Sequence, residues 1–218
     1  MVEREATKHE GTESGERAPR WEVRFGCSLA VLAAALAVND LGGGKFGSDE
    51  LAFSNEKTST YMWYQSKGLK ESLAEGQRDF LGALLAGSGL EPSLRGDLQT
   101  RREQVLKDVE RYGREKREIL LGSKAVGESG WAQDMDGELG KVIGAQDYER
   151  AIEGLGAAGD RFDLANLFLQ LSLVAGAIGI LLSEDTLKRF FFFGMLSLGA
   201  AGLVFSALAY RLALSVSL

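Results

Sequence analysis

Three glycines with the spacing of a nucleotide-binding loop are the first feature that could do chemistry. Gly154, Gly156 and Gly159 match the glycine pattern of a dinucleotide fingerprint. That loop works only when a strand leads into it and a phosphate-facing helix leaves it. Here an acidic helical stretch precedes the glycines and an apolar segment follows them. The spacing therefore does not predict a nucleotide site.

A second motif with possible chemistry is an acidic turn. Asp134, Asp136 and Gly137 resemble the start of a calcium-binding loop. With Gly137 at the turn position, Ala132 and Ile143 fall where the outer oxygen ligands of such a loop belong. Neither side chain can bind calcium, so we interpret the segment as a solvated acidic turn and predict no metal site.

Few residues are suited to catalysis. The chain has one histidine, His9, in a polar tail, and one cysteine, Cys27, which we expect to be a buried, inert thiol. Histidine supplies most general bases, so its scarcity argues against an enzyme, and no cofactor is expected. The net charge of −6 argues against nucleic acid as a partner, since such proteins present a basic face.

Long apolar runs dominate the rest of the sequence and predict the elements that hold these residues. The chain carries no charge over 164–183 or over 190–210, and only a short segment separates the two runs. Each is long enough to cross a hydrocarbon core, which takes about 20 apolar residues as helix. A shorter run begins at Phe25. We favour a retained membrane helix there over a cleaved signal peptide, although Ala35-Leu36-Ala37 resembles a cleavage site. The expected boundaries are a disordered charged tail (1–24), transmembrane helices (25–41, 164–183 and 190–211), a helical extramembrane domain (42–163), a loop (184–189) and a C-terminal tail (212–218).

The extramembrane region is predicted to contain a helical hairpin. Gly42–Gly44 should end the first helix, the Gly-rich turn before Pro92 should join two long helices, and 122–160 should form shorter helix because interior glycine costs about 1 kcal/mol. Both long helices show coiled-coil-like repeats in steps of three and four, which indicate close helix–helix contacts. The repeat over 48–86 comprises Ala52, Asn55, Ser59, Met62, Ser66, Leu69, Leu73, Gly76, Phe80 and Ala83, and that over 93–121 comprises Leu98, Val105, Tyr112 and Ile119, supported by Leu94 and Val109.

Small and polar residues mark the helix faces within the membrane. Small side chains let helix backbones approach, which drives association in lipid. Asn166 and Gln170 lie one turn apart and either form a hydrogen-bonding helix contact or line a pore. The candidate packing residues, within the chain or toward a second copy, are Ser172, Gly176, Gly179, Gly199, Gly202 and Ser206.

Three stretches together resemble a family of bacterial membrane proteins known as domain of unknown function 4337. They are the short apolar segment with its Gly-rich exit, the motif Trp63-Tyr-Gln-Ser-Lys-Gly-Leu-Lys70, and Phe162–Gln170 leading into two closely spaced spans. The resemblance covers most of 25–210 and implies topology rather than activity. The positions that match the family motif are Trp63, Tyr64, Gln65, Lys67 and Lys70.

We therefore expect an all-α integral membrane protein with three transmembrane helices and a coiled-coil-like extramembrane region. Arg17, Arg20 and Arg24 before the first span, with Lys188 and Arg189 in the short loop, place the N-terminus in the cytoplasm and 42–163 in the periplasm of an inner membrane. We expect membrane lipid to surround the three transmembrane helices. A self-associating structural or scaffolding component, most simply a homo-oligomer, is the first functional hypothesis, and a channel lined by Asn166 and Gln170 is the second.

Overall fold

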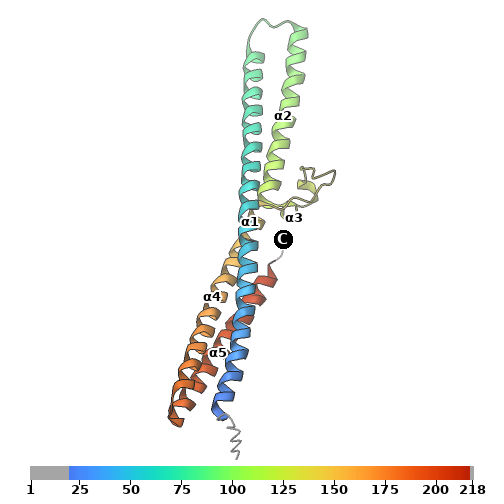
Figure 1. The fold of residues 1–218 in the computed structure, drawn as a ribbon. Coiled ribbons are helices and arrows are strands. Elements are labelled where there is room, and N and C mark those ends of the chain that lie inside the picture. The colour runs from blue at the N-terminus through green and yellow to red at the C-terminus, as the bar shows by residue number, and fades with distance from the viewer. Residues whose placement is uncertain (1–19, 217–218) are drawn as a thin grey trace, which may run out of the picture. The chain divides into compact units, whose positions relative to one another are not determined.

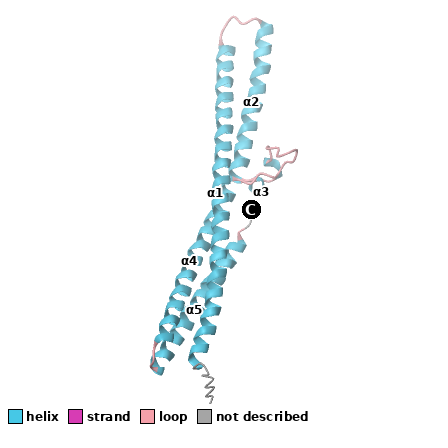
Figure 2. Ribbon diagram, in the orientation of Figure 1, coloured by secondary structure: helices cyan, strands magenta, loops and turns pink. Residues whose placement is uncertain are grey.

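The described part of the protein, residues 20–216 of a computed structural model, is helical and contains no strand (Figures 1 and 2). The expectations for His9, Arg17 and the rest of 1–19 lie outside these residues. Residues 20–24, assigned to the tail, are already helical. The elements are α1 (Arg20–Ala86), α2 (Pro92–Leu121), α3 (Ser123–Val126), a 3-10 turn (Glu128–Gly130), α4 (Ala145–Leu181) and α5 (Asp185–Ser215).

The chain divides into two compact units. Among the described residues, the first comprises 20–38 together with 165–204, and the second comprises 39–164 together with 205–216. Helices α1, α4 and α5 contribute to both units, whereas α2 and α3 belong to the second alone.

An apolar core joins three helix segments in the first unit. Phe25 and Leu32 of α1 pack against Leu169 of α4 and Met195 of α5. The ring of Trp21 meets the ring of Phe192 edge to face at 5.7 Å between centroids, so the beginning of α1 is fixed by aromatic contact.

Most of the apolar surface on α1, α4 and α5 remains uncovered. Each of these helices is long and apolar enough to cross a membrane, yet only 17 to 28 % of the residues in its most apolar stretch are buried within the chain. Water is a poor solvent for such a surface, and lipid is a good one. The expectation that Cys27 is buried is wrong: its thiol lies exposed on α1, because Phe25 and Leu29 occupy the face that packs inward.

A cluster of aromatic rings forms the core of the second unit where α1, α4 and α5 meet. Phe46 stacks on Phe162 with 5.9 Å between centroids, and Tyr210 meets Phe162 edge to face at 5.0 Å. Asn39 donates a side-chain hydrogen bond of 3.0 Å to the backbone carbonyl of Phe162. These contacts tie α1 to α4 with one polar and one aromatic interaction, and α5 to α4 with a second aromatic interaction.

The prediction that Gly42–Gly44 end the first helix is wrong, because α1 continues unbroken from Arg20 to Ala86. The structure gives a packing reason for glycine at the first of these positions. A side chain on Gly42 would overlap the Tyr210 phenol and come within 3.0 Å of the Phe162 ring. Gly42 therefore lets the aromatic cluster close against the α1 backbone.

The expectation of shorter helix over 122–160 holds only for its first part. Residues 131–144 form a loop, but α4 begins at Ala145 and runs through Gly154, Gly156 and Gly159 without a break. These glycines lie inside a helix and form no phosphate-binding loop. Apolar burial of Leu155 and Ala158 in the core of the second unit supports the helix there.

Candidate functional site

The inner face of the hairpin, where α1 faces α2, is largely polar. Along α1 the positions turned inward follow steps of four and three, the spacing of a coiled-coil contact, and all are buried or half-buried. Several of them carry charge, which is unusual for such a contact. The inward positions of α1 are Phe53 and Lys57, which face Tyr148 and Glu149 of α4, followed by Thr60, Tyr64, Lys67, Glu71, Ala74, Arg78, Leu81 and Leu85 along the hairpin.

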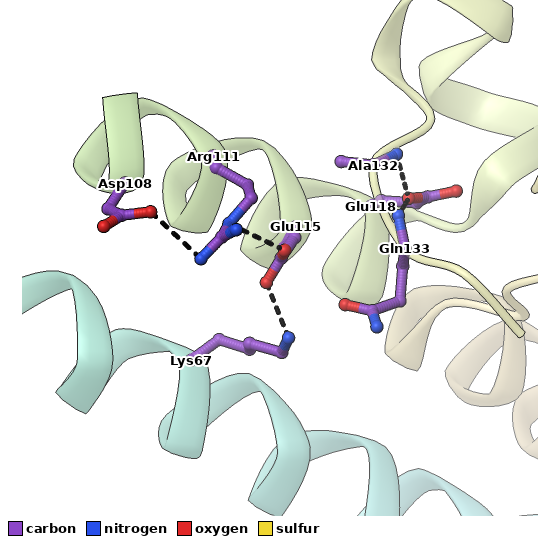
Figure 3. A network of polar contacts seen from close by, with 7 residues as sticks. All are labelled: Lys67, Asp108, Arg111, Glu115, Glu118, Ala132 and Gln133. Atoms are coloured by element: carbon purple, nitrogen blue, oxygen red, sulfur yellow. Dashed lines mark hydrogen bonds and ion pairs between the residues drawn. The ribbon is translucent and has the colours of Figure 1, made fainter. Parts of the chain in front are cut away.

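Two short ion pairs hold α1 to α2. Lys67 Nζ lies 2.6 Å from Glu115 Oε2, and Glu115 also meets Arg111 at 3.5 Å (Figure 3). Lys116 Nζ lies 2.6 Å from Glu71 Oε2. The Lys67–Glu115 pair is mostly shielded from water, so losing one partner would leave a poorly solvated charge.

The second pair is reinforced by close packing. Lys116 also lies over the Tyr64 ring, 5.2 Å from its centroid. A side chain at Gly113 would come within 3.1 Å of the Glu71 carboxylate, so glycine gives this pair its room. The hydrogen bond to Glu71 raises the pKa of Lys116, and partial burial opposes that rise.

A fully buried carboxylate anchors the loop that follows α2. Glu118 accepts hydrogen bonds of 2.8 Å each from the backbone N–H groups of Ala132 and Gln133 (Figure 3). It also accepts a hydrogen bond of 2.7 Å from Ser123 Oγ. Ser123 Oγ in turn accepts a bond from the backbone N–H of Val142. Each oxygen of Glu118 is satisfied, so this arrangement is structural and holds both ends of the loop to α2.

The outer face of α1 carries the repeat that the apolar pattern identified. The expected seam from Ala52 to Ala83 does not contact α2; all ten positions are exposed. Its large side chains, Met62, Leu69, Leu73 and Phe80, are between 61 and 65 % exposed. At 100° per residue the seam lies roughly 200° around α1 from the polar inner face. A helix-length row of apolar side chains therefore has no cover within the described chain.

Most of the repeat in α2 is turned inward. Leu98, Val105, Val109 and Tyr112 are half-buried and Ile119 is fully buried, whereas Leu94, one of its two supporting positions, is exposed. Pro92 lies at the start of α2, as predicted.

The predicted small residues lie at close helix contacts in the first unit. A side chain on Gly176 would come within 2.6 Å of Leu29 and Met195, and one on Gly202 within 2.7 Å of Leu169. Gly179 faces the Phe25 ring and Gly199 faces Leu32. Ser172 is buried and bonds to the carbonyl of Leu169 in its own helix, and Ser206, in the second unit, is half-buried.

Asn166 and Gln170 lie in different surroundings. Asn166 is half-buried, whereas Gln170 is exposed on α4. A pore that uses both side chains would need further copies of the chain around Gln170, and it stays a prediction.

The acidic segment after α3 is a tight surface turn. Asp134 Oδ1 accepts a 2.6 Å hydrogen bond from the Gly137 N–H, and Met135 and Glu138 exchange two backbone bonds. Asp136 and Gly137 have positive φ angles of 55° and 89°, which suits the turn of a tight hairpin.

The matched motif residues divide between the two faces of α1. Tyr64 and Lys67 contact α2, through Lys116 and Glu115 respectively. Trp63 is half-buried, and Gln65 and Lys70 are exposed. The motif thus fixes the hairpin with two of its members and leaves two in solvent.

A family comparison matches residues 21–212 to the family described as Domain of unknown function (DUF4337). The chain belongs to this family. The match covers both units and confirms the resemblance seen in the sequence. No curated protein and no solved structure matches the chain. Family membership therefore carries no assigned activity to this chain.

Proposed function

We propose that this DUF4337 protein is a self-associating structural component of the bacterial inner membrane, without catalytic activity. The observation that carries the proposal is the exposed seam of α1, in which Met62, Leu69, Leu73 and Phe80 follow coiled-coil spacing and lie open to solvent. Regular steps of three and four fit a partner helix rather than a globular surface.

The partner we propose is a second copy of the same helix. Copies in one membrane share an orientation, so two α1 helices meet in parallel and identical residues lie at the same level. In that arrangement Ser59, Ser66, Leu73 and Phe80 occupy the a positions of the heptad, and the remaining large side chains occupy d positions.

The charges flanking the seam permit this pairing. The e and g positions carry only three charges, on Glu56, Lys70 and Asp79. In the parallel register none of the three faces a like charge, because their opposite neighbours are Leu51, Gln65 and Leu84. The parallel pairing therefore brings no like charges together at these flanking positions.

The area of the contact suits a weak to moderate interface. Burying one large apolar side chain removes on the order of 100 Å² of surface from water, so four from each copy give about 800 Å². The small residues between them bring the total near the roughly 1,000 Å² of a specific interface. The polar inner face keeps α2 on the other side, since its ion pairs have no counterpart on the outer seam.

The proposal is tested by cysteine cross-linking in native membranes, after Cys27→Ser removes the native thiol. Leu73→Cys places a thiol at an a position and should give a covalent dimer on mild oxidation. Gln104→Cys, at an exposed position of α2, is the matched control and should remain monomeric. Equal cross-linking at the two positions, or none at Leu73, would overturn the proposal.

We further propose the orientation in which the N-terminus is cytoplasmic and 42–163 is periplasmic. The basic residues that flank the first span and fill the loop between the other two support this orientation. The loop contributes Lys188 and Arg189, and Arg24 precedes the first span.

A further inference from the structure

A pocket of about 350 Å³ lies in the second unit where α3 and the 3-10 turn contact α2. Arg114 and Arg117 line it from α2, and Ser129 lines it from the 3-10 turn. Apolar groups complete the wall, among them Leu121 and Val126. Pockets that bind small molecules have volumes of about 300 to 1,000 Å³, so this one has room for a small ligand.

The two arginines of the pocket have no ion-pair partner in the described chain. Both are exposed, and neither guanidinium lies within ion-pair distance of a carboxylate. Glu110 lies one turn before Arg114 on α2 but does not pair with it, and Glu128, next to Ser129, does not line the pocket. Two like charges one turn apart on a helix repel each other, so an anion that contacts both would be stabilised by both.

The wall formed by α3 and the 3-10 turn is held in place by the chain itself. Ser123, the first residue of α3, donates a 2.7 Å hydrogen bond to the buried Glu118 carboxylate. Its carbonyl accepts a 3.0 Å hydrogen bond from the Trp131 indole. A side chain at Gly130 would come within 2.8 Å of Val126, so the turn packs closely on α3. A ligand would therefore not have to order this wall when it binds.

The donors of the pocket fit a phosphate group better than a carboxylate. Each guanidinium can present two parallel N–H groups to an anion, and the Ser129 hydroxyl adds a further donor. These donors exceed the about four hydrogen bonds that a carboxylate accepts. A phosphate monoester offers three oxygens and carries a charge of about −2 at pH 7, which matches the two arginines.

We propose that this pocket binds a small phosphate monoester, with the phosphate held by Arg114 and Arg117 and the ester group against Leu121 and Val126. The two apolar side chains are half-buried, and an ester group would cover the surface that they still expose. The pocket shares no residue with the seam of α1 and does not depend on membrane placement. The proposal can therefore fail or hold separately from the proposed function.

The test follows the amide resonances of Ser129 and Gly130 by NMR as phenyl phosphate is added to the full-length protein in nonionic detergent. Saturable shifts at these two amides are expected. Arg114→Gln with Arg117→Gln should weaken the affinity by on the order of tenfold or more, because charge-assisted hydrogen bonds are lost. The absence of saturable shifts in the native protein would overturn the proposal.

A matched double variant controls for net charge. Arg101→Gln with Arg102→Gln removes the same charge at exposed positions of α2 that do not line the pocket. This control should leave the affinity for phenyl phosphate within about twofold, since salt screens distant charges. Equal loss of affinity in both double variants would show a nonspecific charge effect and would overturn the proposal.

Two further ligands test the chemical class. Benzoate carries the same ring on a carboxylate, and inorganic phosphate lacks the ring, so both should bind more weakly than phenyl phosphate. Equal binding of benzoate would assign the pocket to carboxylates, and equal binding of inorganic phosphate would leave the apolar wall without a role; either result overturns the proposal. The pocket variant should still cross-link through Leu73→Cys, which separates this test from that of the seam.

Discussion

Glu118 is the single residue on which the loop between α2 and α4 most depends. Its carboxylate is fully buried and accepts three hydrogen bonds, two of them from the backbone of Ala132 and Gln133. Glu118→Ala should lower the free energy of unfolding by about 3 kcal/mol, because buried donors lose a charged acceptor.

Amide hydrogen exchange tests this prediction at the two N–H groups. Protection at Ala132 and Gln133 should fall sharply in Glu118→Ala, while Glu110→Ala, at an exposed position on the same helix, should leave it unchanged. Unaltered protection in the Glu118 variant would mean that other contacts hold the loop.

The ion pair between Lys116 and Glu71 has a predictable pH dependence. The hydrogen bond to Glu71 raises the pKa of Lys116 above the 10.5 of a free lysine side chain. Because the folded pKa is the higher one, the pair contributes its full stabilisation below about pH 10.5 and loses it as the pH rises through the folded value.

A carbon-13 NMR titration of the Lys116 side chain measures this shift. The apparent pKa should lie above 10.5 in the native protein and move down in Glu71→Gln. Glu103→Gln, at an exposed position about three and a half turns earlier on α2, should not change the pKa of Lys116. A Lys116 pKa that is unchanged in Glu71→Gln would contradict the pairing.

At the scale of elements, the continuity of α1 is the feature most open to test. Gly42 faces the Tyr210 phenol, whereas a side chain on Gly44 would meet nothing within 4 Å. Gly44→Ala should therefore stabilise the helix by about 1 kcal/mol, through the better helix propensity of alanine. Gly42→Ala should destabilise the protein despite the same gain, because the aromatic cluster must shift.

Thermal unfolding of the two variants in one detergent gives the comparison. A higher midpoint for Gly44→Ala and a lower one for Gly42→Ala are expected. Equal shifts of the same sign would mean that α1 is interrupted near these glycines.

How far the sequence predicts each element depends on what holds that element in place. The repeat in α2 identifies its inner face, because Leu98, Val105 and Ile119 are apolar and face α1. In α1 the apolar repeat marks the outer face instead. Its inner face depends on Lys67 and Glu71, whose partners lie 48 and 45 residues away and cannot be assigned from local periodicity.

The Gly42–Gly44 run is a second place where local sequence does not predict the element correctly. Glycine propensity predicts a helix end there, but tertiary contact with Tyr210 overrides it.

At the scale of the whole molecule, the apolar runs predict three long helices and the structure contains them. Charge-free stretches of about 20 residues have few alternatives to helix in lipid, which makes this the most predictable part of the chain. The spacing of its residues in the sequence locates the seam, but only the structure shows that α2 leaves it uncovered. The proposed role of the protein as a self-associating component therefore depends on the partner of this seam.

The mass of the full-length protein in mild detergent or lipid nanodiscs is the most direct measurement of that partnership. Native mass spectrometry should give at least twice the 23.5 kDa of one chain. Leu69→Asp with Leu73→Asp should reduce the mass to a single chain, because parallel pairing would oppose like charges in the seam, while Leu94→Asp, at an exposed position of α2, should not. A native protein that stays at 23.5 kDa at every concentration, or a seam variant that keeps the larger mass, would contradict self-association through α1.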